Sequence, residues 1–168
     1  MSEQLWAPWR MDYIRNADKK EECIFCAFPS MSSEFDRQNL ILHRAAHAFI
    51  ILNAYPYSNG HLMVVPYRHT STLNEYSDAE MLEIMHLTRL SIQVLSLSLK
   101  PEAYNGGLNM GRSAGAGIAS HLHWHVVPRW NGDTNFMSVI NDTRVIPESL
   151  HSVYDSLKQA LDTTLKER

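Results

Sequence analysis

The chain contains a run in which histidines alternate with apolar residues, His121-Leu-His123-Trp-His125-Val-Val127. Successive side chains of a β-strand point to opposite faces, so this run predicts a strand with three histidines on one face. The residues between the histidines share the other face and would form its buried side. Chance is a weak rival explanation, because 9 histidines in 168 residues give about 0.03 such triplets per chain.

Further strand signals lie on both sides of a predicted turn. Residues 48–53 and 61–66 are rich in β-favouring side chains, and residues 55–60 between them have turn chemistry. They are predicted to form a hairpin over residues 48–66. The remaining predicted strands cover residues 39–43, residues 104–110 with an interruption at Gly106-Gly107, and residues 121–129.

Two helices are predicted. Ser77 and Glu80 fit a capping box, S-x-x-E, after which apolar residues recur at three- and four-residue spacing as far as Leu99. Pro101 then blocks continuation of the helix. Residues 149–165 show a second apolar stripe at helical spacing and close the chain.

Strands with mostly tight connections and two helices predict an α+β fold. We expect an antiparallel sheet of about five strands with a long helix on one face, together with a C-terminal helix. The length of 168 residues predicts a single domain over residues 1–168. Residues 1–38 are predicted to be an irregular N-terminal segment. Its aromatic stretch, residues 6–14, would pack onto a partner subunit or onto the chain's own core.

The composition excludes several kinds of partner. The chain is 45% hydrophobic and 20% charged, as globular proteins are, and 15 basic against 18 acidic residues give a net charge of −3. No overall basic field exists to hold nucleic acid or a membrane, so a polyphosphate ligand would have to be held locally. The first residues lack the layout of a signal peptide, and the uncharged stretch 48–67 contains Asn53, Pro56 and His61. We expect a soluble, cytoplasmic protein.

Three kinds of chemistry fit three histidines on one strand face. The imidazoles could ligate a metal, as alternating histidines can in a sheet. They could instead form a structural cluster. In the third alternative, one histidine is a nucleophile in covalent catalysis and its neighbours orient it.

The loop before the histidines bears on this choice. Gly111, Gly115 and Gly117 free the backbone to approach a ligand closely, and successive amides of such a loop can form an anion-binding nest. Three nearby side chains suit phosphate, namely Ser113, Arg112 and Arg129. Alone, this pattern is also typical of a flexible hairpin loop. Directly before three histidines, it indicates a phosphate held against an imidazole.

The run 121–127 matches at every position the pattern of the histidine-triad (HIT) family, H-φ-H-φ-H-φ-φ, in which φ is apolar. The resemblance extends back to Asn39 and covers most of the chain. Segments 6–10, 109–115 and 125–136 are more narrowly similar to the bacterial diadenosine-tetraphosphate phosphorylases of that family. The family implies nucleotidyl transfer through a covalent nucleotidyl-histidine, and a homodimer.

The resemblance implies a role for each matching position. His123 would attack the α-phosphorus of a nucleoside polyphosphate and form an AMP-enzyme, with its tautomer fixed by a backbone carbonyl in the next strand region. His125 would contact the phosphate, and His61 would support the triad from behind. The implied binding residues are Asn53 for the ribose, and Asn109, Arg112, Ser113, Gly115, Gly117 and Arg129 for phosphate. Mg²⁺ would accompany the polyphosphate.

A second group of residues has the ligand types of a tetrahedral zinc site. Cys23 and Cys26 form a C-x-x-C pair, and His69 and His121 supply two later histidines. Some members of the family and the related galactose uridylyltransferases look similar, with the first triad histidine as the fourth ligand. On this interpretation His121 is structural and ties the N-terminal segment to the triad strand. The alternative is a pair of reduced cysteines without a metal.

The resemblance implies phosphorolysis of diadenosine tetraphosphate to ADP and ATP as the leading function. Uridylyltransferases carry glutamine where this chain has His125, which disfavours sugar-nucleotide transfer. Many hydrolase branches carry glutamine and a hydroxyl residue where this chain has Gly117 and Ile118, which disfavours plain hydrolysis. The alternatives are a HIT-type hydrolase that uses water as the second nucleophile, and a zinc-stabilised nucleotide-binding module with little turnover.

Overall fold

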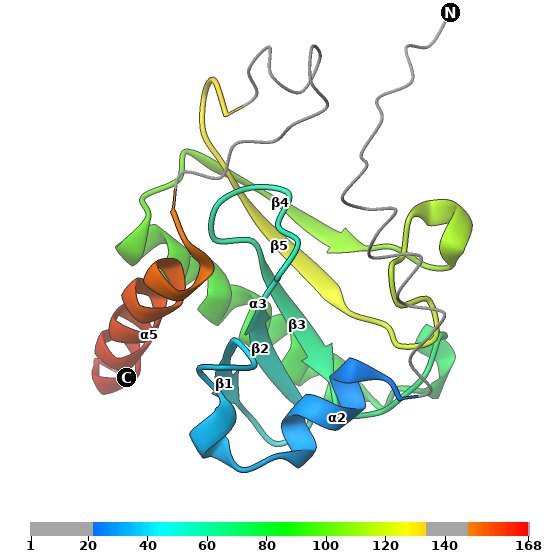
Figure 1. The fold of residues 1–168 in the computed structure, drawn as a ribbon. Coiled ribbons are helices and arrows are strands. Elements are labelled where there is room, and N and C mark those ends of the chain that lie inside the picture. Colours follow the sequence, from blue (N-terminus) through cyan, green and yellow to red (C-terminus); the bar gives the residue numbers. More distant parts are fainter. Residues whose placement is uncertain (1–21, 134–147, 168) are drawn as a thin grey trace, which may run out of the picture.

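The computed structural model describes residues 22–133 and 148–167. Within these residues, five antiparallel strands form one sheet in the order β1-β2-β3-β5-β4 (Figure 1). The strands are β1 (Ile41–Arg44), β2 (Ala48–Leu52), β3 (Leu62–Pro66), β4 (Ala103–Leu108) and β5 (Trp124–Arg129). The predicted α+β class and strand number are therefore confirmed.

The predicted hairpin is formed by β2 and β3, whose residues are buried throughout. Its register pairs Ala48 with Pro66 and Leu52 with Leu62. Strand β3 then pairs with β5, where Met63 lies opposite His125. This pairing brings the loop of the hairpin, residues 53–61, beside the histidine strand.

The long helix α3 (Asp78–Ser98) covers one face of the sheet and contacts β2, β3 and β5. Its capping box is present as predicted, because Ser77 accepts from the Glu80 amide and the Glu80 carboxylate accepts from the Ser77 amide. Helix α5 (Leu150–Lys166) begins after the cap residue Ser149, packs on α3 and contacts β1 (Figure 1). No helix in the described ranges is long and apolar enough to cross a membrane.

Three local predictions were wrong. Residues 23–38 are not irregular, because they contain helix α2 (Ile24–Ser30) and a 3-10 turn at Ser33–Phe35. Strand β4 continues through Gly106 and Gly107, because a ladder needs only backbone amides and carbonyls. Strand β5 begins at Trp124, so the first two histidines of the run precede it.

Two further 3-10 turns complete the described elements, at Leu73–Glu75 and Arg112–Ala114. The second lies in the glycine-rich loop before β5. The predicted aromatic arm at residues 6–14 lies outside the described residues, and so does the end of the segment 125–136.

Candidate active site and metal cluster

A cavity of about 260 Å³ lies where helix α2 faces the sheet. Its apolar wall includes Ile24, Phe25 and Phe28 of α2. Three further groups of residues line it: residues 38–40 before β1, residues 51–55 and 57 at the loop end of the hairpin, and Met63, Gly115, Gly117, His123 and His125. The cavity is therefore apolar on one side and carries two imidazoles on the other.

His123 presents a ring nitrogen with a free lone pair. Its Nδ1–H donates to the His121 carbonyl oxygen at 2.9 Å, which leaves Nε2 as the unprotonated nitrogen of the neutral ring. Burial lowers the pKa of His123, and the bond to the carbonyl opposes this shift in part. The carbonyl that fixes the tautomer was predicted to come from the next strand region. That prediction was wrong, because the carbonyl belongs to His121. Because β5 begins only at Trp124, the carbonyl two residues upstream is available to accept.

His125 has the other tautomer, with its proton on Nε2. The Tyr57 amide donates to His61 Nδ1 at 3.1 Å, so the proton of the neutral His61 ring lies on Nε2. That Nε2–H donates to His125 Nδ1 at 2.8 Å. In the neutral His125 ring the remaining proton is then on Nε2. The two cavity-lining triad histidines thus carry a lone pair on one Nε2 and a proton on the other.

The supporting residues behind His125 are held in place by the hairpin loop. Asn53 Oδ1 accepts from the Tyr55 amide at 2.9 Å, and Asn53 Nδ2 lies 3.3 Å from His61 Nδ1. The Tyr57 ring lies 4.7 Å from the His61 ring and 5.6 Å from the His125 ring, centroid to centroid. Sequence reasoning treated Tyr57 as turn chemistry and missed this contact.

Of the six predicted phosphate-binding residues, two line the cavity, one lines a neighbouring hollow and three line neither. Gly115 and Gly117 line the cavity, and Gly111 and Gly115 adopt φ of 82° and 90°, which favours glycine. Asn109, Arg112 and Ser113 are not among the described residues that line it. Arg129 lines a neighbouring hollow that shares Tyr57 with the cavity. There its guanidinium donates to Asp133 at 2.9 Å and to Asn105 at 2.7 Å.

The structure brings together Cys23, Cys26, His69 and His121, whose ligand atoms all lie within 4.8 Å of one another. The measured sulfur–nitrogen separations are 3.3, 3.5 and 3.6 Å. Zinc–sulfur and zinc–nitrogen bonds at tetrahedral angles place sulfur and nitrogen about 3.5 Å apart. The four residues thus form a cluster that could hold a tetrahedral metal ion.

The protonation states of His121 and Cys26 affect metal binding in opposite ways. His121 Nε2–H donates to the Pro66 carbonyl at 2.8 Å, which leaves the Nδ1 lone pair facing the sulfurs. Burial lowers the pKa of His121 to about 4, so the ring is neutral near pH 7. Burial, together with the neighbouring Cys23, raises the pKa of Cys26 to about 11, so a metal would have to displace its proton.

Phe25 connects the cluster with the cavity and was also missed. It lies between the two cysteines in sequence, and its ring centroid is 5.5 Å from that of His121 and 5.0 Å from that of His123. The side chain is 2% exposed. The C-x-x-C spacing identified Cys23 and Cys26 as candidate ligands, and no periodic pattern marked the two residues between them.

Comparison with known proteins agrees with this geometry. A family model described as the HIT domain matches residues 35–132. An AP-4-A phosphorylase of Mycobacterium tuberculosis is 42% identical over 153 residues, 88% of this chain and 78% of that protein. The adenosine 5′-monophosphoramidase hnt1 of Schizosaccharomyces pombe is 30% identical over 109 residues, 65% of this chain and 75% of that protein.

Solved structures share the fold. A zinc-bound histidine triad family protein of Mycobacterium smegmatis superposes with a TM-score of 0.68 at 21% identity, and covers 88% of this chain and 98% of its own. At this identity the likeness is one of fold, and it extends over nearly the whole of the smaller protein.

Proposed function

The chain belongs to the HIT domain family, and on that premise we propose that it catalyses phosphorolysis of diadenosine tetraphosphate to ADP and ATP. One observation carries the proposal: two buried imidazoles in one cavity present a lone pair and a proton, respectively, at Nε2. Attack on phosphorus needs a nucleophile and a hydrogen-bond donor for the oxygens that gain charge. The choice of substrate rests on the M. tuberculosis relative.

In the first step, His123 Nε2 attacks the α-phosphorus of the substrate. A phosphorus–nitrogen bond forms, the bond from that phosphorus to its bridging oxygen breaks, and ATP leaves with the electron pair. His125 Nε2–H donates to a non-bridging oxygen and stabilises the charge that develops there. The Nδ1–H bond to the His121 carbonyl stabilises the cationic ring that results.

In the second step, an oxygen of inorganic phosphate attacks the AMP-enzyme. The phosphorus–nitrogen bond breaks, the electron pair returns to His123, and ADP is released. The second anion needs hydrogen-bond donors, for which we propose the amides of Gly115 and Gly117 in the cavity wall. We further propose that Asn109, Arg112, Ser113 and Arg129 contribute along the path of the polyphosphate.

The shape of the cavity fits one half of the substrate. Its apolar side, formed by Ile24, Phe25 and Phe28, suits a nucleobase, and we propose that Asn53 contacts the ribose. A volume of about 260 Å³ lies just below the usual range of ligand cavities, about 300–1,000 Å³, so we propose that the cavity holds one nucleoside monophosphate. The rest of the polyphosphate then extends outside, where ATP can leave after the first step.

We propose zinc as the occupant of the cluster formed by Cys23, Cys26, His69 and His121. Two thiolates and two imidazoles in tetrahedral arrangement are the donor set that zinc favours. Zinc would supply structural stability, with no role in the reaction steps. We further propose a cytoplasmic location, because two cysteines that bind zinc must stay reduced, as they do in the cytosol.

We also propose a homodimer, built on β4. This strand pairs with β5 on one side and forms an edge of the described sheet on the other. Most of its residues are exposed. An unpaired strand edge is a template for pairing with another chain, and a second copy would extend the sheet across a two-fold axis.

The decisive test is to incubate the protein with diadenosine tetraphosphate and Mg²⁺, with and without millimolar phosphate. We expect phosphate to accelerate cleavage and the products to be ADP and ATP with little AMP, because a bound phosphate has the advantage of proximity over water. Chromatography of the nucleotides measures both outcomes. Cleavage to AMP and ATP at a rate independent of phosphate would establish the hydrolase instead. Nucleotide binding without cleavage would indicate the binding module.

A further inference from the structure

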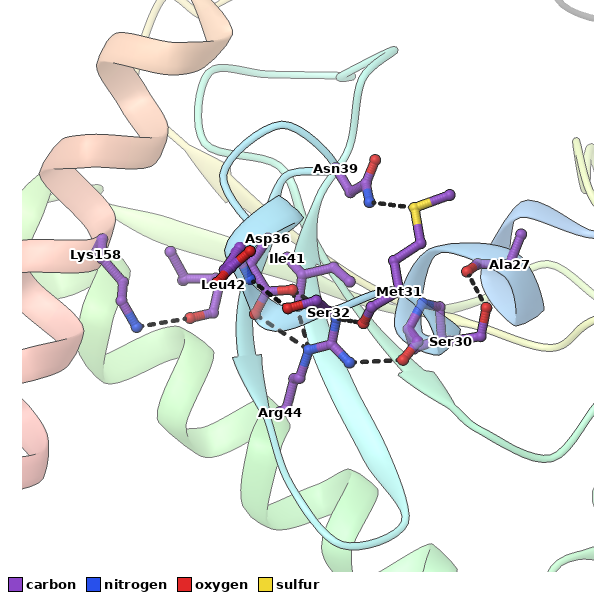
Figure 2. Close-up of polar contacts among 12 residues, drawn as sticks. Ala27, Ser30, Met31, Ser32, Asp36, Asn39, Ile41, Leu42, Arg44 and Lys158 are labelled. Atoms are coloured by element: carbon purple, nitrogen blue, oxygen red, sulfur yellow. Dashed lines mark hydrogen bonds and ion pairs between the residues drawn. The ribbon is translucent and has the colours of Figure 1, made fainter.

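The guanidinium of Arg44 donates hydrogen bonds to three residues next to segments that line the cavity (Figure 2). It donates to the Pro29 carbonyl at 2.6 Å and to the Met31 carbonyl at 3.2 Å, at the end of helix α2. It also forms a bidentate pair with Asp36, in which Nη2 donates to Oδ1 at 2.6 Å and Nε donates to Oδ2 at 3.1 Å. The side chains of Arg44 and Asp36 are 25% and 21% exposed, respectively, so solvent weakens this pair less than a surface pair.

Helix α2 needs an external partner at this end. It has seven residues and no basic residue in its last turn, and an isolated helix of this length is unstable in water. The last carbonyls of a helix lack partners within the helix. Arg44, the last residue of β1, supplies charged donors from the sheet to this end of the helix.

The two segments that Arg44 joins both line the cavity. Helix α2 supplies Ile24, Phe25 and Phe28, and the chain after Asp36 supplies residues 38–40. A further contact joins the same segments, since Asn39 Nδ2 donates to Met31 Sδ at 3.3 Å (Figure 2). Arg44 itself is not among the residues that line the cavity.

The second segment is held in an uncommon conformation. Leu40 has φ of 61°, a left-handed value that few residues other than glycine adopt, and its side chain is 8% exposed. Such a residue persists only where its surroundings fix it. Leu40 itself accepts from the Leu52 amide at 2.9 Å. Asp36 adds to these contacts, because its carbonyl accepts from the Ile41 amide at 2.8 Å and its carboxylate accepts from Arg44.

We propose that Arg44 is a positioning residue that fixes the nucleoside-binding wall of the cavity, so that it determines affinity for the nucleotide and leaves the chemistry to the triad. This inference rests on the proposed function for the identity of the ligand. Its physical basis is that Arg44 bonds the end of α2 and Asp36, which precedes residues 38–40. The hydrogen bonds that orient the His123 and His125 rings come instead from His121 and His61.

The test compares Arg44→Met with the wild type in two measurements. Calorimetry gives the Kd for AMP, and steady-state kinetics give kcat and KM for diadenosine tetraphosphate. We expect Arg44→Met to raise Kd and KM about tenfold and to change kcat less than about threefold. Arg44→Lys should fall between the two, because an ammonium cannot make the bidentate pair and both carbonyl bonds together.

Arg37→Met is the matched control. Arg37 also forms a bidentate pair, with Asp155 of α5 at 2.8 and 2.9 Å, but the two side chains are 57% and 54% exposed. This pair ties the same segment to α5, but it is exposed to solvent, so its loss should change Kd and KM less than about twofold. Asp36→Asn provides a second perturbation of the Arg44 contacts. Its effect on Kd should be less than additive with that of Arg44→Met, because the two residues act through one pair.

The outcomes separate this inference from the proposed function. Equal Kd and KM in wild type and Arg44→Met, with only a lower Tm or a smaller fraction of active sites, would overturn it and leave Arg44 structural. If Arg44→Met does not fold, Arg44→Lys and Asp36→Asn decide by the same measurements. If the wild type binds AMP without cleaving diadenosine tetraphosphate, the proposed function fails, and the AMP affinities still decide the role of Arg44.

Discussion

His123→Ala is expected to abolish turnover of diadenosine tetraphosphate while AMP binding stays within about tenfold of the wild type. The variant loses the one unprotonated Nε2 of the two cavity-lining triad histidines. Removal of a covalent nucleophile costs on the order of 10⁴-fold or more in kcat in other enzymes. Binding changes little, because the apolar wall and the hairpin loop remain. Turnover and calorimetric affinity, measured on the same preparation, check both parts.

Two further variants sharpen this result. His125→Ala should keep a measurable rate, on the order of 10²- to 10³-fold below wild type, because it removes a hydrogen-bond donor and leaves the nucleophile. His86→Ala removes an exposed histidine of α3 and should change nothing. Intact-protein mass spectrometry without added phosphate should show one covalent AMP on the wild type and none on His123→Ala. Near wild-type turnover in His123→Ala would refute the covalent mechanism.

The parts of the fold that could be predicted are those fixed by local signals. The capping box at Ser77 and Glu80 formed as predicted, and Ser149 caps α5 through the Ser152 amide. The hairpin of β2 and β3 follows from two apolar runs around a turn. In each case neighbours in sequence supply both the side chains and the hydrogen-bond partners, so the pattern alone determines the element.

Helix α2 could not be predicted because its partners are distant in sequence. It contains Pro29 and is too short to show periodicity, and its cap residue Cys23 makes no side-chain capping bond. The contacts of its two cysteines reach 43 to 98 residues along the chain. Arg44 then holds its other end from the sheet. Tertiary contacts therefore override weak local propensity here.

The candidate site shows the same division. The types of residue in the triad and the metal cluster were visible in the sequence, and the structure brings the four cluster residues together as predicted. The sequence did not show which of the two Nε2 atoms carries a proton and which carries a lone pair. It depends on the His121 carbonyl and on the Tyr57 amide, which are backbone groups that no side-chain pattern records. The roles of the phosphate-binding residues stay predictions.

Cys23→Ser is expected to abolish stoichiometric zinc binding and to lower the free energy of unfolding by about 3 kcal/mol, or Tm by about 10 °C. The affinity of structural zinc for a folded site contributes directly to folding, by on the order of 10 kcal/mol in small zinc domains. The smaller value expected here reflects a core formed by the sheet, α3 and α5, which does not depend on the metal. Elemental analysis and thermal unfolding measure the two effects.

The conservative control is Cys23→His, which keeps a zinc ligand and should retain more metal and more stability than Cys23→Ser. Chelator treatment of the wild type should reproduce the lower Tm of Cys23→Ser and have no effect on that variant. The effect should extend to AMP affinity, because Phe25 lies between the two cysteines and contacts the His123 ring at 5.0 Å. A well-folded wild type with far less than half an equivalent of any transition metal would show that the cluster is not a metal site. Helix α2 would then be held by Arg44 and by the packing of Phe25, Ile24 and Phe28 against the core.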